Sequence, residues 1–118
     1  MTSGRYILRG QLPVEEPDLL VWADWFERAS RTHSRQVADI MIEGIRISTV
    51  FLSIDHQFED GPPVLFETMI FDQRPNRDPP LASHLADHCA RYATWLEASI
   101  GHDLAVTLVR AWLAEIRT

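Results

Sequence analysis

The sequence predicts an α+β fold in which an antiparallel β-sheet of about four strands packs against two main helices. Apolar residues recur at helical spacing near both ends of the chain, in residues 18–29 and 95–117. Between them the period changes to two and β-branched residues dominate, which is typical of strands. The turns between these strands are too short for a parallel crossover, so we expect antiparallel pairing. The length of 118 residues predicts a single α+β domain over residues 1–118.

The N-terminal part predicts a short strand followed by a helix. Residues 6–9 alternate apolar and polar side chains and form a brief strand, expected at a sheet edge. Pro13 and Pro17 predict that no regular structure forms before the next element. A helix is expected from Asp18, a good N-cap, to about Ala29. We expect its aromatic residues to anchor it on the sheet.

Three further strands are expected in the middle of the chain. Residues 36–42 and 45–54 alternate and are separated by Glu43-Gly44, a tight hairpin turn. A second turn is expected at residues 59–63. Residues 64–71 follow and are apolar on almost every position, which predicts a strand in the centre of the sheet.

Residues 72–80 contain three prolines and four charges and predict a long loop. Apolar residues then recur at helical spacing over residues 81–89, which predicts a short third helix. Residues 91–93 are compatible with extended chain instead.

The last element is a long helix that begins at a capping box. Thr94 and Glu97 have the spacing at which each side chain bonds the other residue's amide, and the helix is expected to reach about Arg117. One apolar stripe of this helix faces the sheet. The stripe is formed by Trp95, Ala98, His102, Ala105, Val106, Val109, Leu113 and Ile116.

Composition and charge limit the classes of function. The 17 acidic and 11 basic residues give a net charge of −6, which argues against direct binding to nucleic acids and anionic membranes. Cys89 is the single cysteine, so no disulfide forms within the chain. We expect no leader, the sequence contains no apolar stretch of about 20 residues, and we expect a cytoplasmic protein. The glycines are isolated and form no phosphate-binding loop, so we expect no cofactor.

Four titratable residues are candidates for catalysis. Asp55 and His56 follow one predicted strand, Glu67 lies in the next, and His102 lies in the apolar stripe of the last helix. A carboxylate in an apolar strand near an imidazole can serve as a general base or a metal ligand. The alternative is structural, with Glu67 and His102 as a satisfied core pair and Asp55-His56 as a turn cap.

A weaker metal candidate lies in the predicted short helix. His84 and His88 are four residues apart, which places two imidazoles on one helical face, and Cys89 is adjacent in sequence. Two histidines at this spacing are common by chance, and no second motif completes a tetrahedral site. We therefore expect no bound metal.

Two surfaces are candidates for binding a partner. Arg28, Arg31, His33 and Arg35 form a basic run at the end of the first helix, where cations complement the helix dipole or meet an acidic surface or a phosphate. The last helix carries a second apolar stripe opposite His102. It consists of Ile100, Leu104, Leu108 and Ala111. Either the short helix at residues 81–89 or another chain must cover it.

The sequence also resembles a family of small uncharacterised proteins encoded by bacteriophages and prophages. The resemblance rests on STVFLSIDHQF at 48–58, GPPVLFETMIF at 61–71, YATW at 92–95 and GH at 101–102. It extends from the helix that contains WADWFE at 22–27 to His102, and departs from the family pattern between Arg74 and His88. The resemblance carries no known activity. It implies a gene of a mobile element, whose small products often bind and inhibit host proteins, including CRISPR effectors.

We therefore expect a non-enzymatic protein that binds and inhibits a bacterial host protein or complex, with a CRISPR-type defence effector as one candidate. The acidic residues are interspersed with arginine, so binding by shape is preferred over imitation of DNA. The expected partner-binding residues are Ile100, Leu104, Leu108, Arg28, Arg31 and Arg35. The alternatives are a small metal-binding hydrolase that uses Glu67 and His102, and a structural homodimeric phage protein.

Overall fold

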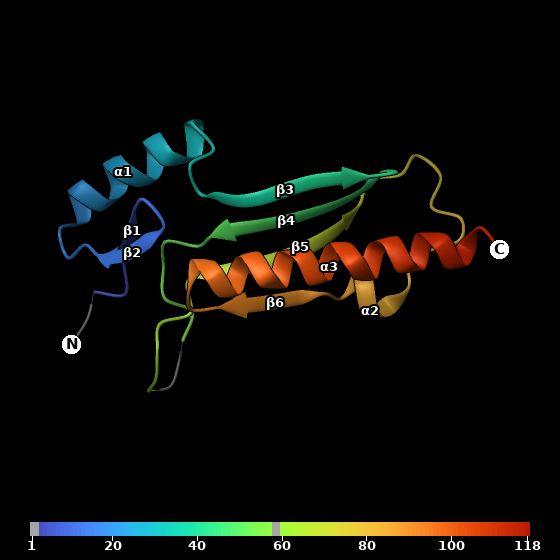
Figure 1. The fold of residues 1–118 in the computed structure, drawn as a ribbon. Coiled ribbons are helices and arrows are strands. Elements are labelled where there is room, and N and C mark those ends of the chain that lie inside the picture. Colours follow the sequence, from blue (N-terminus) through green and yellow to red (C-terminus); the bar gives the residue numbers. More distant parts are fainter. Residues whose placement is uncertain (1–2, 58–59) are drawn as a thin grey trace.

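The computed structural model describes residues 3–57 and 60–118. It contains a two-stranded sheet, a four-stranded sheet and three helices, all drawn in Figure 1. In chain order the elements are β1 (Tyr6–Arg9), β2 (Leu12–Glu15), α1 (Leu19–Arg31), β3 (Gln36–Ile42), β4 (Ile45–Phe51), β5 (Phe66–Asp72), α2 (Ser83–Ala86), β6 (Cys89–Tyr92) and α3 (Trp95–Ile116). The predicted α+β class and antiparallel pairing are confirmed.

The main sheet is an antiparallel meander in the order β3-β4-β5-β6, so the predicted central position of the third middle strand is confirmed. Glu43 and Gly44 both have positive φ angles, 49° and 83°, as expected for the two central residues of a type I′ hairpin turn. A Cβ atom at Gly44 would lie 2.7 Å from Cγ of Arg74, so glycine is also required by the close approach of the loop that follows β5.

Two strand assignments need correction. The fourth strand of the main sheet is β6, whereas residues 6–9 pair with β2 in a separate hairpin. Pro13 lies inside β2, opposite Leu8. The prediction of irregular chain there was wrong, because a strand with a free edge tolerates a residue that lacks an amide hydrogen. The predicted helix at 81–89 is reduced to the single turn of α2, and its last residue begins β6.

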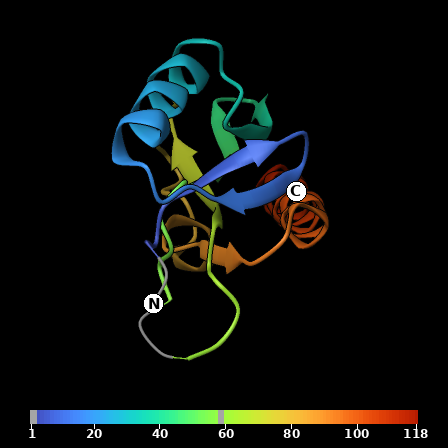
Figure 2. The same ribbon diagram turned by 90° about the vertical axis from the view of Figure 1, so that its left-hand side faces the viewer.

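Helix α1 forms as predicted but is held at one end of the molecule. The Asp18 carboxylate accepts hydrogen bonds from the amides of Leu20 and Val21. The indole of Trp22 donates to the carbonyls of Tyr6 and Ser53, at 3.1 and 3.2 Å. In the end-on view of Figure 2, α1 lies on one side of the β1–β2 hairpin and α3 on the other. The helix therefore packs on the hairpin and the end of the sheet rather than across its face.

Helix α3 runs along one face of the main sheet (Figure 1). Its capping box is confirmed: Thr94 accepts from the Glu97 amide, and the Glu97 carboxylate accepts from the Thr94 amide. Two apolar clusters fill the space between helix and sheet. The larger cluster consists of Ile42, Ile45, Ile47, Ile70, Leu85, Ala105, Val109, Trp112 and Leu113. The smaller one consists of Phe51, Leu65, Phe66 and Ala98. Trp112 was absent from the predicted stripe.

The molecule is elongated, with principal extents of 53 × 31 × 20 Å. Among the residues that the structure describes, no helix is both long enough and apolar enough to cross a bilayer.

Truncation of Leu85 is predicted to destabilise the fold strongly. Its side chain is fully buried and joins α2 to the larger core cluster. Leu85→Ala should lower the free energy of unfolding by about 2–5 kcal/mol, measured by urea denaturation. Leu20→Ala is the matched control, because Leu20 on α1 is 80% exposed. Equal effects of the two substitutions would contradict the assigned core.

Candidate functional site

A buried polar layer separates the two apolar clusters. Nδ1 of His102 on α3 lies 2.8 Å from Oγ1 of Thr49 on β4, and this oxygen lies 2.6 Å from Oγ1 of Thr68 on β5. All three side chains are buried, and both threonines are inaccessible to solvent. The two threonines are direct cross-strand partners. Each of the three residues is a polar position in the otherwise apolar buried face of its own strand or helix. The three positions lie next to one another.

Burial lowers the pKa of His102, and the nearby carboxylates of Asp103 and Asp39 oppose this effect more weakly. The imidazole is therefore neutral at pH 7. Nδ1 of the neutral ring accepts from the Thr49 hydroxyl or donates to it according to the tautomer, and the Thr49 and Thr68 hydroxyls bond each other in either case. This chain satisfies the three groups within the core, as the structural alternative for His102 anticipates, but with threonines instead of Glu67 as partners.

Glu67 lies on the opposite face of the sheet from His102. Successive side chains of a strand point to opposite faces, so Glu67 faces away from the helix while its neighbour Thr68 faces toward it. Its carboxylate binds Nε of Arg91 at 2.9 Å and lies 3.5 Å from Sγ of Cys89. Glu67 and His102 therefore do not meet, either as a catalytic pair or as a core pair. Burial, together with the negative charge of Glu67, raises the pKa of Cys89, which keeps the thiol protonated.

Asp55 and His56 lie in the chain that connects β4 to β5. One carboxylate oxygen of Asp55 accepts from the amides of Gln57 and Val64, at 2.8 and 2.9 Å. The amide of His56 donates to the Val64 carbonyl at 3.0 Å. These bonds close a turn, in agreement with the structural alternative. The turn predicted at 59–63 begins outside the described residues.

His84 and His88, the candidate metal ligands, do not lie on one helix in the structure. Helix α2 ends at Ala86, so His88 does not lie one turn above His84 on a common face. Burial lowers the pKa of His88. Within residues 3–57 and 60–118, no group of three His, Cys, Asp or Glu side chains is arranged to hold a metal ion.

The arginines at and after the end of α1 have two different roles, one inside the fold and one on the surface. Arg35 turns inward: its Nε donates to the Phe51 carbonyl at 3.0 Å, and its guanidinium lies 4.3 Å from the centre of the Phe26 ring. Burial lowers the pKa of Arg35. Arg28 pairs with Asp24 at 2.9 Å on the surface. Arg31 is exposed and forms no ion pair with any residue that the structure describes.

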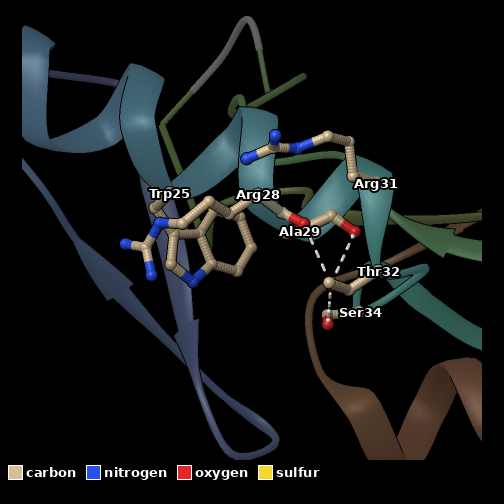
Figure 3. A pocket seen from close by; sticks show the side chains of 6 residues that line it. All are labelled: Trp25, Arg28, Ala29, Arg31, Thr32 and Ser34. Atoms are coloured by element: carbon tan, nitrogen blue, oxygen red, sulfur yellow. Dashed lines mark hydrogen bonds between the residues drawn. The ribbon is translucent and has the colours of Figure 1, made fainter.

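A recess of about 370 Å³ lies at this end of α1 (Figure 3). It is lined by Trp25, Arg28, Ala29, Arg31, Thr32 and Ser34. The hydroxyls of Thr32 and Ser34 are 2.6 Å apart, and the Thr32 hydroxyl donates to the Arg28 carbonyl at 2.9 Å. An aromatic wall, two arginines and two hydroxyls form a surface that fits a carboxylate-bearing side chain. Arg28 and Arg31 are predicted binding residues, whereas Trp25 was expected only among the aromatic residues that anchor the helix.

The second apolar stripe of α3 is open at Ile100, Leu104 and Ala111 but not at Leu108. Ile100 and Leu104 are exposed, as is Leu96, which precedes them by one turn. Leu108 is partly buried against the larger core cluster and does not contribute to the open surface in the way the sequence predicted. Helix α2 inserts Leu85 into the core and leaves these side chains uncovered.

Comparisons with protein-family models, with curated proteins and with solved structures find no significant match to this chain. The resemblance to phage and prophage proteins therefore remains a prediction from the sequence pattern.

The buried His102 makes stability depend on pH. The unfolded chain binds a proton near pH 6.5, whereas the folded chain binds it only at lower pH, because burial lowers the pKa. The free energy of unfolding should therefore fall as the pH is lowered from 7.5 to 5.5. His102→Gln should weaken this dependence, measured by urea denaturation at both pH values. The same substitution at the exposed His84 is the control, and an unchanged pH dependence in His102→Gln would refute the assignment.

Proposed function

We propose that this protein is a non-catalytic binding protein that covers an acidic surface of another protein. The surface formed by helix α1 carries the proposal. Of its thirteen residues only Ala29 is buried. Leu19, Leu20 and Val21 are exposed near its beginning, and the arginine recess lies at its end. Helix α1 packs on the rest of the protein along one narrow side only. The remaining surface of the helix is exposed and can contact a partner over a large area.

The charge of the recess favours an acidic partner. The chain has a net charge of −6, so a local excess of arginine is distinct from the rest of its surface. Asp24 offsets the charge of Arg28, whereas Arg31 is left available for a bidentate contact with a carboxylate. Trp25 adds an apolar wall, and tryptophan and arginine are the residue types that most often dominate binding energy at interfaces.

The hydrolase alternative is not supported by the geometry. Glu67 is engaged by Arg91 on one face of the sheet, and His102 is engaged by Thr49 on the other. Asp55 holds a turn through backbone amides. Each of these side chains has a structural hydrogen-bond partner, and they do not line a common pocket in which a substrate could bind.

The biological setting of the proposal comes from the sequence. The likeness to phage and prophage proteins supports a mobile-element gene whose product acts in the bacterial cytoplasm. A protein of this kind would inhibit its host target by occlusion, and a CRISPR-type defence effector is one such target. The partner sought is therefore a bacterial protein with an acidic, accessible surface.

Charge reversal of the arginines in the recess is predicted to weaken binding of the partner protein. Tagged wild-type protein should capture a stoichiometric protein from lysate of the bacterial host, identified by mass spectrometry. Arg28→Glu/Arg31→Glu should weaken the affinity for the purified partner by about tenfold or more, because like charges then face each other.

Arg77→Glu is the matched control, because Arg77 is an exposed arginine in the loop after β5. It should bind as wild type does. Circular dichroism verifies that each variant is folded. Undiminished binding by the double variant, or absence of a stoichiometric partner, would contradict the proposal.

A further inference from the structure

The outer face of α3 is apolar along most of its length. Leu96, Ile100 and Leu104 are 70%, 62% and 58% exposed. Three smaller exposed residues continue this face toward the C-terminal end of the helix, namely Thr107, Ala111 and Ala114. The Thr107 hydroxyl donates to the Asp103 carbonyl at 3.0 Å, so its methyl group remains for apolar contact. With 22 residues, the helix offers a stripe about 30 Å long.

The spacing of this face is that of a helix-pairing seam. Ile100, Leu104, Thr107, Ala111 and Ala114 are separated by four, three, four and three residues. This is the heptad spacing that keeps apolar side chains facing a partner helix. The opposite face of α3 is already occupied by its own sheet, so the seam is available only to another chain.

We propose that a second copy of this chain covers the seam, with the two α3 helices antiparallel about a two-fold axis. The large residues lie in the N-terminal half of the seam and the small ones in the C-terminal half. Antiparallel pairing places Ile100 opposite Ala111 of the second copy, and Leu104 opposite Thr107. Large side chains then fill the space left by small ones in these layers, each of which the two-fold axis repeats. Parallel pairing would stack alanine on alanine at one end and leave a gap.

The charges beside the seam agree with this arrangement. Asp103 and Arg110 are seven residues apart, so they lie on the same flank. Both are exposed, and neither forms an ion pair with a residue in the described part of the chain. Antiparallel pairing brings Asp103 of each copy to Arg110 of the other. A two-fold axis repeats every contact, so the surface is complementary to itself.

The hairpin at the N-terminal end of α3 extends the interface. A groove of about 390 Å³ lies between β1–β2 and the beginning of α3, with Leu12 and Leu96 at its sides. Arg9 also lines it. In the antiparallel pair Glu115 of the second copy comes opposite Leu96, within reach of this groove and of the positive charge of Arg9.

The exposed area of the chain is consistent with an unfilled interface. The accessible surface is 7349 Å². A monomer of 13.6 kDa is expected to expose about 6,600 Å². The elongated shape of the chain and the open surface of α1 contribute to this excess together with the uncovered face of α3. This inference goes beyond the proposed function, because α1 and α3 lie on different sides of the hairpin (Figure 2). A dimer would present two α1 recesses.

Sedimentation equilibrium of the full chain tests the inference. Wild-type protein should sediment with twice the chain mass of 13.6 kDa. Leu104→Asp should raise the dimer dissociation constant about 100-fold, because it places two carboxylates at the centre of the seam. Ala111→Glu serves the same purpose if Leu104→Asp does not fold. Leu20→Asp, which alters an exposed leucine of α1, should remain dimeric.

A charge exchange tests the orientation of the helices. Asp103→Arg and Arg110→Asp should each weaken the dimer by about tenfold, since each creates like-charged contacts across the seam. The double variant Asp103→Arg/Arg110→Asp should restore it. A monomeric wild type at several hundred micromolar, a dimer insensitive to Leu104→Asp, or a double variant as weak as the single ones would overturn the inference. These outcomes do not depend on capture of a host protein, so the two proposals fail separately.

Discussion

The hydrogen-bonded layer of His102, Thr49 and Thr68 is the constraint on which the seating of α3 depends. Apolar contacts on either side of this layer are non-directional, so they bury one stripe of α3 without demanding a single hydrogen-bond geometry. The layer has one geometry, because a shift of α3 by one residue leaves a buried imidazole without a partner, which costs about 1–3 kcal/mol. Together with the apolar stripe that buries Ala98, Ala105, Val109 and Leu113, the layer fixes which face of α3 is inside and which is outside.

That orientation produces the surface of the molecule. Once His102 points at the sheet, Ile100 and Leu104 must point away from it, because they lie on the opposite side of the helix. At the other end of the chain, α1 is held through the bonds of Trp22 and the edge-to-face contact of Trp25 with Phe51, and most of its surface stays open. The fold is thus a sheet covered by α3 on one face. The outer face of α3 and most of the surface of α1 remain available to other chains. The proposed dimer and the proposed acidic partner use these separate surfaces.

Local signals in the sequence predicted much of this fold, whereas features that depend on distant residues were missed. The caps at Asp18 and Thr94 are defined by their own neighbours, and the Glu43-Gly44 turn by its backbone angles. Strand β2 was missed because a proline has no amide hydrogen to donate. Pro13 is tolerated only because β1 pairs with one edge of β2 and the other edge is free, which the local sequence does not reveal. The expectation that Glu67 shares a face with His102 assumed that a turn near residues 59–63 joins the two strands directly. Strand β4 instead ends at Phe51, and the register pairs Val50 with Glu67, so the Glu67 side chain points to the other face.

Removal of the entire polar layer tests whether these hydrogen bonds seat α3 on the sheet. In the triple variant Thr49→Val/Thr68→Val/His102→Leu no buried group lacks a partner, so the core should remain folded. The account predicts that α3 then samples more than one seating, seen in an amide NMR spectrum as broadened or multiplied resonances of α3 and the two strands. A spectrum with one sharp resonance per residue and native contacts between α3 and the sheet would show that apolar packing alone positions the helix, and would contradict the account.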